Sequence, residues 1–177
     1  EDVTGLHVWP AALLLGQWLA EAGALVEGRR VVELGSGCGV GGVVAARVCG
    51  ASHVTLTEYH GLTLRNLCHN VAVAAGVDPG VELGAGAAFA TAVSPTCAPM
   101  CVRRVDWDDP AALADLRDAG LIIGSDLVYR EAQAHKLVGV LQALVPPGNT
   151  ATRVLLVIPD GRLGLEALLD GLRAAGF

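Results

Sequence analysis

The chain contains few aromatic and few charged residues. Aromatic side chains make up 4% and charged side chains 17% of its 177 residues, whereas hydrophobic residues make up 53%. This composition argues against an intrinsically disordered chain, which combines low hydrophobicity with high net charge. The length suits one domain that buries about 70% of the surface of its unfolded chain. We therefore expect a single folded domain over residues 1–177, with an aliphatic core.

Positive charge and long apolar runs are scarce as well. There are 12 Lys and Arg residues against 18 Asp and Glu residues, which gives a formal net charge of −6. Because most nucleic-acid-binding proteins attract the phosphate backbone with basic surfaces, nucleic acid is not an expected partner. No apolar run reaches the roughly 18 residues of a membrane span, and no signal peptide opens the chain. We therefore predict a cytoplasmic protein, with the nucleus as a second location, and no membrane partner.

The five cysteines form no CxxC pair, and their odd number argues against a disulfide framework. We expect reduced thiols. Cys97 and Cys101, together with His60 and His69, could ligate a metal, but their spacing is not that of a zinc site. No metal centre is therefore predicted.

Short aliphatic runs alternate with longer helical patterns along the chain. This rhythm predicts an α/β fold: a Rossmann-like, doubly wound, mostly parallel sheet with helices on both faces. Strands are expected at 30–34, 53–57, 102–106, 121–124 and 153–158. Helices are expected at about 10–22, 40–49, 62–75, 111–118, 131–144 and 165–172. The stretch at about 84–100 is rich in small residues and has no clean period, so we predict a surface insertion loop there.

The stretch VVELGSGCGVGG, residues 31–42, leads from a strand into closely spaced glycines. Gly35, Gly37 and Gly39 fall at the C-terminal end of the first strand, where open parallel sheets bind ligands. Glycine there lets the main chain turn tightly and approach a ligand closely. The dinucleotide pattern GxGxxG also fits, but only in a frame that begins too late after the strand. The frame that fits the strand end is an acid, Glu33, followed by alternate glycines, and we expect this loop to seat a cofactor.

Two carboxylates accompany the loop. Glu33, near the end of the first strand, can orient the loop and accept a hydrogen bond from the ammonium of a ligand, whereas a pyrophosphate would gain nothing from its charge. Glu58 ends the second strand about twenty residues after the loop, where one acid can accept hydrogen bonds from both hydroxyls of a ribose. The alternative for Glu58 is a surface acid that caps a helix.

Four segments, in this order, resemble the class I, seven-strand, S-adenosylmethionine-dependent methyltransferases, and more narrowly the methyltransferase-like protein-lysine methyltransferases. They are GLHVWPAALLLGQWL, VVELGSGCGVGG, VTLTEYHGLTLRNLCHNV and IIGSDLVYRE, and VDWDD is a fifth, smaller match. Members of that family modify heat-shock chaperones, translation elongation factors, an AAA ATPase and calmodulin. The resemblance implies S-adenosylmethionine as the cofactor and a lysine of a protein substrate as the methyl acceptor.

The resemblance also implies roles for individual residues. Asp126 and Tyr129 form the acid-x-x-Tyr motif of the family and would hold the acceptor amine. Trp107 would stack on the adenine, Trp9 would cover the methionine end of the cofactor, and Ser125 would belong to the cofactor site. The alternatives are structural: Asp126 as a helix cap, Tyr129 as a packing residue, and both tryptophans as core residues.

The chain departs from the family pattern in places. Relatives often carry a second Asn four residues after the one at Asn70, where this chain has Ala74. Relatives also finish the sheet with an antiparallel pair of strands, which we expect to be missing here.

Three other functions stay open from the sequence. The first is a small-molecule N-methyltransferase, and the second is a noncatalytic module that binds S-adenosylmethionine. The third is an NAD(P)-dependent oxidoreductase, which the late GxGxxG frame permits but which Glu33 and the SDLVY block disfavour.

Overall fold

A computed structural model of the chain describes residues 4–78, 88–94 and 96–177. The strands in these residues are β1 (Arg30–Leu34), β2 (His53–Glu58), β3 (Ala88–Ser94), β4 (Cys97–Arg104), β5 (Leu121–Ser125) and β6 (Arg153–Val157). The helices are α1 (Pro10–Glu21), α2 (Val40–Arg47), α3 (Gly61–Ala75), α4 (Pro110–Ala114), α5 (Glu131–Leu144) and α6 (Leu165–Ala174). Two short 3-10 helices, η1 (Thr4–Leu6) and η2 (Gly23–Leu25), flank α1.

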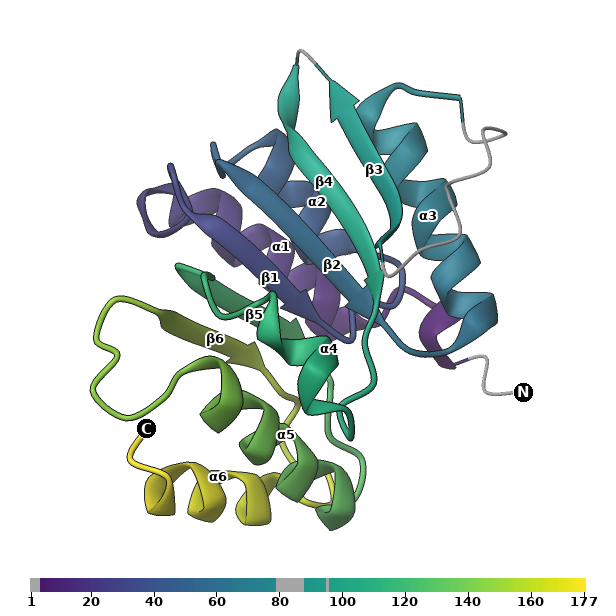
Figure 1. The fold of residues 1–177 in the computed structure, drawn as a ribbon. Coiled ribbons are helices and arrows are strands. Elements are labelled where there is room, and N and C mark those ends of the chain that lie inside the picture. The colour runs from purple at the N-terminus through teal and green to yellow at the C-terminus, as the bar shows by residue number, and fades with distance from the viewer. Residues whose placement is uncertain (1–3, 79–87, 95) are drawn as a thin grey trace.

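Within the described residues the strands form one sheet in the order β3-β4-β2-β1-β5-β6 (Figure 1). The five strands from β4 to β6 pair in parallel, and β3 pairs antiparallel with β4 at the edge. The chain winds outward from β1 to β4 in one direction and through β5 and β6 in the other, so the order switches beside β1. The predicted doubly wound, mostly parallel α/β fold is therefore confirmed.

Two hydrophobic cores cover the two faces of the sheet. One joins the sheet to α1, α2 and α3, and the other joins it to α4, α5 and α6. Neighbouring residues of one central strand serve opposite cores, as Val31 and Val32 of β1 do. Because both faces of these strands are buried, their sequences read as continuous apolar runs rather than as alternating ones.

The segment at about 84–100, predicted as an insertion loop, is corrected by the structure. Residues 88–94 form β3, and β4 already begins at Cys97, five residues before the predicted strand start. The two strands pair antiparallel, with register shifts between Ala88 and Ala90 and between Ala92 and Ser94. Ladder pairing uses backbone groups, so it forms here where the side chains show no regular period. Residues 84–87 and 95 of the predicted loop lie outside the described residues.

Helix α4 is shorter than predicted. It ends at Ala114, and the chain continues through turns in which the N–H of Leu116 donates to Leu113 O at 3.1 Å and that of Ala119 to Leu116 O at 3.2 Å. These bonds span three residues instead of the four of an α-helix. In the part of the chain that the structure describes, no helix is long and apolar enough to cross a membrane.

Candidate active site

A cavity of about 380 Å³ opens at the C-terminal ends of β1, β2 and β5. Its wall comes from segments that are distant in sequence: the start of the chain through α1, the β1–α2 loop, the end of β2, the residues after β4 and the residues after β5. This is the edge at which doubly wound sheets bind ligands. The predicted site residues that line it are Trp9, Gly35, Gly37, Glu58, Trp107, Ser125, Asp126 and Tyr129.

The glycines of the β1–α2 loop have backbone conformations that favour glycine. Gly35, Gly37 and Gly39 have φ angles of 53°, 53° and 84°. A Cβ atom on Gly35 would lie 2.7 Å from Leu127 Cδ2, so this position also lacks space for a side chain. Gly39 lies outside the cavity wall, directly before α2, and serves the turn into that helix.

Glu33 lies beneath the start of α2 and outside the cavity wall. Glu33 is 2% exposed, and its Oε2 accepts a hydrogen bond from the N–H of Gly42 at 3.1 Å. Burial raises the pKa of this carboxyl from its ordinary 4.5 to about 7, although the hydrogen bonds from Gly42 and Ser36 act in the opposite direction. Of the two roles predicted for Glu33, this geometry supports orientation of the loop and provides no contact with a ligand in the cavity.

Glu58 joins the end of β2 to the glycine loop. Its Oε2 accepts from the N–H of Gly37 at 3.1 Å, and its Oε1 accepts from the N–H groups of Tyr59 at 2.7 Å and His60 at 3.2 Å. These N–H groups precede the first turn of α3, so the helix-cap alternative does not describe its contacts. A carboxylate oxygen has two acceptor sites, so Oε2, with one backbone bond, retains capacity for a ligand hydroxyl.

Two asparagines on α3 support the loop from the other side. Asn70 Nδ2 donates to the carbonyl oxygen of Cys38 at 3.0 Å, and Asn66 Nδ2 lies 3.8 Å from Cys38 Sγ. Sequence reasoning looked for a second Asn at Ala74, four residues after Asn70, but the partner lies four residues before it. Positions four apart share one helix face, so the spacing of Asn66 and Asn70 was an available signal.

The two predicted cofactor tryptophans occupy different parts of the cavity wall. Trp9 precedes α1, and its Nε1 donates to the carbonyl oxygen of Thr4 at 3.0 Å. Trp9 is 36% exposed, so it is not a buried core residue. Trp107 follows β4, is half-buried and packs partly on the core beside α4. Both rings therefore border the cavity, and each is anchored by protein contacts.

Asp126 directly follows β5 and is held in an unusual conformation. With a φ of 52°, it is the non-glycine residue of the described chain that has positive φ. Its N–H donates to Val157 O at 2.8 Å. Its buried carboxylate accepts from Arg162 Nε at 2.8 Å and from Arg162 Nη2 at 2.5 Å. Helix α5 has no side-chain cap, and its N-cap residue is Arg130, so the alternative of Asp126 as its cap is wrong.

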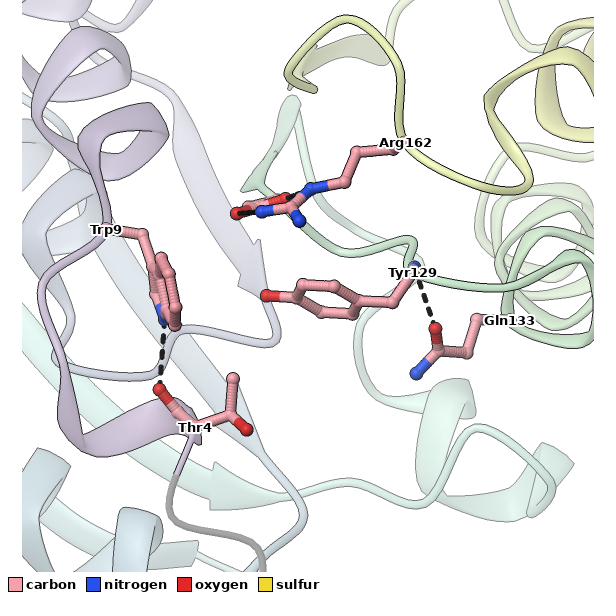
Figure 2. A network of polar contacts seen from close by, with 6 residues as sticks. Thr4, Trp9, Tyr129, Gln133 and Arg162 are labelled. Carbon is pink, nitrogen blue, oxygen red and sulfur yellow. Dashed lines mark hydrogen bonds and ion pairs between the residues drawn. The ribbon is translucent and has the colours of Figure 1, made fainter.

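Tyr129 lies beside this ion pair. The guanidinium carbon of Arg162 lies 4.8 Å from the centre of the Tyr129 ring, and the N–H of Tyr129 donates to Gln133 Oε1 at 2.8 Å. Figure 2 shows the Tyr129 hydroxyl pointing toward Trp9, and both residues line the cavity. Sequence reasoning missed Arg162. No local pattern marks this residue, because its contact with Asp126 spans 36 residues.

A sequence model described as lysine methyltransferase matches residues 1–89. The chain belongs to the lysine methyltransferase family. The family resemblance expected from the sequence is thus confirmed.

Curated relatives carry the match beyond residue 89. The chain is 30% identical over 143 residues to protein-lysine N-methyltransferase EEF2KMT of Mus musculus, covering 80% of this chain and 40% of the relative. It is 30% identical to protein-lysine N-methyltransferase EFM3 of Chaetomium thermophilum, covering 98% of this chain and 48% of the relative. It is 32% identical to EEF1A lysine methyltransferase 3 of Mus musculus, covering 81% and 52%. The chain thus spans about half the length, or less, of these family members.

The metal ligands considered from the sequence do not come together in the structure. Among the described residues, no group of three or more His, Cys, Asp or Glu side chains is placed to hold a metal ion. Cys97, Cys101, His60 and His69 therefore form no such group.

Proposed function

We propose that this chain carries the catalytic site of an S-adenosylmethionine-dependent protein-lysine N-methyltransferase. The observation that carries the proposal is the convergence of two half-sites on one cavity. The glycine loop and Glu58 form one half, and Asp126 and Tyr129 form the other. Membership of the lysine methyltransferase family supports the same reading.

The residues of the first half fit S-adenosylmethionine. The cavity volume of about 380 Å³ falls in the usual range of small-molecule sites, about 300–1,000 Å³. Glu58 would accept the ribose hydroxyls, Trp107 would stack on the adenine, and Trp9 and Ser125 would border the methionine end. Gly35 and Gly37 would let the main chain approach the cofactor without a side chain between them.

The residues of the second half fit an amine. When bound, S-adenosylmethionine would supply a sulfonium methyl group whose carbon a neutral amine could attack in line, with S-adenosylhomocysteine as the leaving group. A lysine side chain is neutral in roughly one molecule in two thousand near pH 7, a handicap of about 5 kcal/mol. Asp126 and Tyr129 would orient the amine by hydrogen bonds, and their partly buried surroundings would oppose its charged form.

A translation elongation factor is our candidate acceptor. Two relatives have names that contain the symbol of an elongation factor, EEF2KMT and EEF1A lysine methyltransferase 3. Methylation of purified EEF2 and EEF1A with S-adenosylmethionine labelled in its methyl group tests this choice. Label on a lysine of either protein supports the proposal. Label only on small amines would instead indicate a small-molecule methyltransferase.

Cofactor binding is tested by calorimetry with S-adenosylmethionine, S-adenosylhomocysteine and NAD. We expect the first two to bind, and Glu58→Ala to weaken both at least about tenfold, because a hydrogen bond to a charged group contributes about 1.5–3 kcal/mol. Glu166→Ala, an exposed acid on α6, is the matched control and should bind like the wild type. Binding of NAD alone would indicate an oxidoreductase. Binding of S-adenosylmethionine with no transfer to any acceptor would indicate a noncatalytic module.

A further inference from the structure

The loop between β6 and α6 delivers Arg162 to the site in a fixed position. Two glycines flank Arg162, Gly161 with a φ of 77° and Gly164 with a φ of 97°. A Cβ atom on Gly164 would lie 2.7 Å from the carbonyl carbon of Arg130, so the loop packs directly against the backbone before α5. The position of Arg162 is thus set by the packing of two elements.

Arg162 contacts both residues proposed to hold the acceptor amine (Figure 2). Its guanidinium donates from Nε and Nη2 to the two oxygens of Asp126, a fork geometry that fixes the carboxylate in one orientation. The same guanidinium lies over the Tyr129 ring at 4.8 Å, within the range of a cation–π contact. Arg162 is not among the residues that line the cavity, so it acts on the site through its contacts with Asp126 and Tyr129.

We infer that Arg162 is a positioning residue that also cancels the charge of Asp126, so that the site accepts the neutral lysine amine in preference to its ammonium. This inference rests on the proposed transfer of methyl to an amine. The Asp126 side chain is 3% exposed, so its charge, if unpaired, would act strongly on a neighbouring amine. A carboxylate within about 4–6 Å of an amine raises the amine pKa by about 1–3 units, which would hold lysine in its unreactive form. The Arg162 cation opposes that effect while leaving the oxygens of Asp126 able to accept a hydrogen bond.

Arg162 keeps its charge over the range in which the acceptor titrates. Hydrogen bonding to Asp126 raises the pKa of Arg162, and the negative charge of that carboxylate acts in the same direction. Other ionisable groups lie on the neighbouring segments and across the cavity, among them Asp160, Arg130, Glu131, His7, Glu58 and Lys136. They are unchanged in the variants below, so they contribute equally to each pH profile.

The test compares Arg162→Gln, which removes the charge but keeps an amide donor, with Arg162→Lys, which keeps the charge but loses the fork. In Arg162→Gln we expect kcat near pH 7 to fall at least about tenfold. The acidic limb of the curve of kcat against pH should move by about one pH unit toward alkaline pH. KM should stay equal or fall, because the ammonium binds better. In Arg162→Lys kcat should fall while the limb stays at the wild-type pH. Arg173→Gln breaks an exposed ion pair with Asp170 and should leave the profile unchanged.

Binding of n-butylamine to each protein in the presence of S-adenosylhomocysteine gives a second readout that needs no acceptor protein. Arg162→Gln should bind this amine at pH 7 at least about threefold more tightly than the wild type. A lower kcat with an unshifted acidic limb and no gain in amine binding would overturn the inference and leave Arg162 a purely structural role. A wild type that binds S-adenosylmethionine but transfers no methyl would instead overturn the proposed function. Each variant is first checked for wild-type affinity for S-adenosylhomocysteine.

Discussion

Replacing Glu33 by Gln removes a titratable group from beneath α2 at nearly constant volume. The Gln side-chain oxygen can still accept the hydrogen bond from Gly42, so the packing is kept. In the folded wild type the pKa of Glu33 is about 7, against an ordinary 4.5, so between these values the folded state holds a proton that the unfolded state has released. The contribution of Glu33 to the free energy of unfolding therefore falls as the pH rises from 4.5 to 7, and it stays constant above that range.

The magnitude follows from the shift. One pKa unit corresponds to about 1.4 kcal/mol, so the wild type should lose about 2.5 kcal/mol relative to Glu33→Gln between about pH 5 and about pH 8. Urea unfolding followed by circular dichroism at several pH values measures the difference between the two proteins, in which all other titrating groups cancel. Glu166→Gln, on the exposed surface of α6, should run parallel to the wild type. Parallel curves for Glu33→Gln as well would refute the reasoning, since they would mean that burial does not perturb Glu33.

Three further predictions concern Gly41, Asp126 and Asn70. Gly41→Ala would place its Cβ 2.5 Å from Glu33 Oε1, so urea unfolding should show a free energy of unfolding lower by about 1–3 kcal/mol. Gly139→Ala on α5 is the control: its Cβ would enter open space, so the substitution should be neutral or stabilising. Asp126→Asn should lower kcat about 100-fold, because the acceptor amine would be misplaced. The Kd of S-adenosylmethionine, measured by calorimetry, should stay within about twofold of the wild type. An unchanged kcat would remove Asp126 from the mechanism. Asn70→Ala removes a hydrogen bond to the Cys38 carbonyl and should lower the free energy of unfolding in urea by about 1 kcal/mol. An unchanged free energy of unfolding would mean that this bond does not stabilise the loop.

The parts of the fold that were predictable are those whose signal is local. The apolar run of β1 and the periodic pattern of α5, closed by PPG, gave the bounds Arg30–Leu34 and Glu131–Leu144 that the structure has. The glycine loop and the acid-x-x-Tyr motif were likewise visible as short patterns. Strand β3 was missed because its pairing depends on the backbone of β4. Arg162 was missed because its role depends on a contact 36 residues away, which leaves no mark in the neighbouring sequence.

The cavity wall draws on residues from Thr4 to Lys136, contributed by both wings of the sheet. Within the described chain these residues come from several separate segments, so a ligand in this cavity would bind only after the segments around β1, β2, β4 and β5 have come together. Occupancy and global stability are then linked quantities: a ligand at 100 times its Kd adds about 2.7 kcal/mol to the free energy of unfolding. A melting curve recorded with and without a candidate ligand consequently reports on the site as a whole.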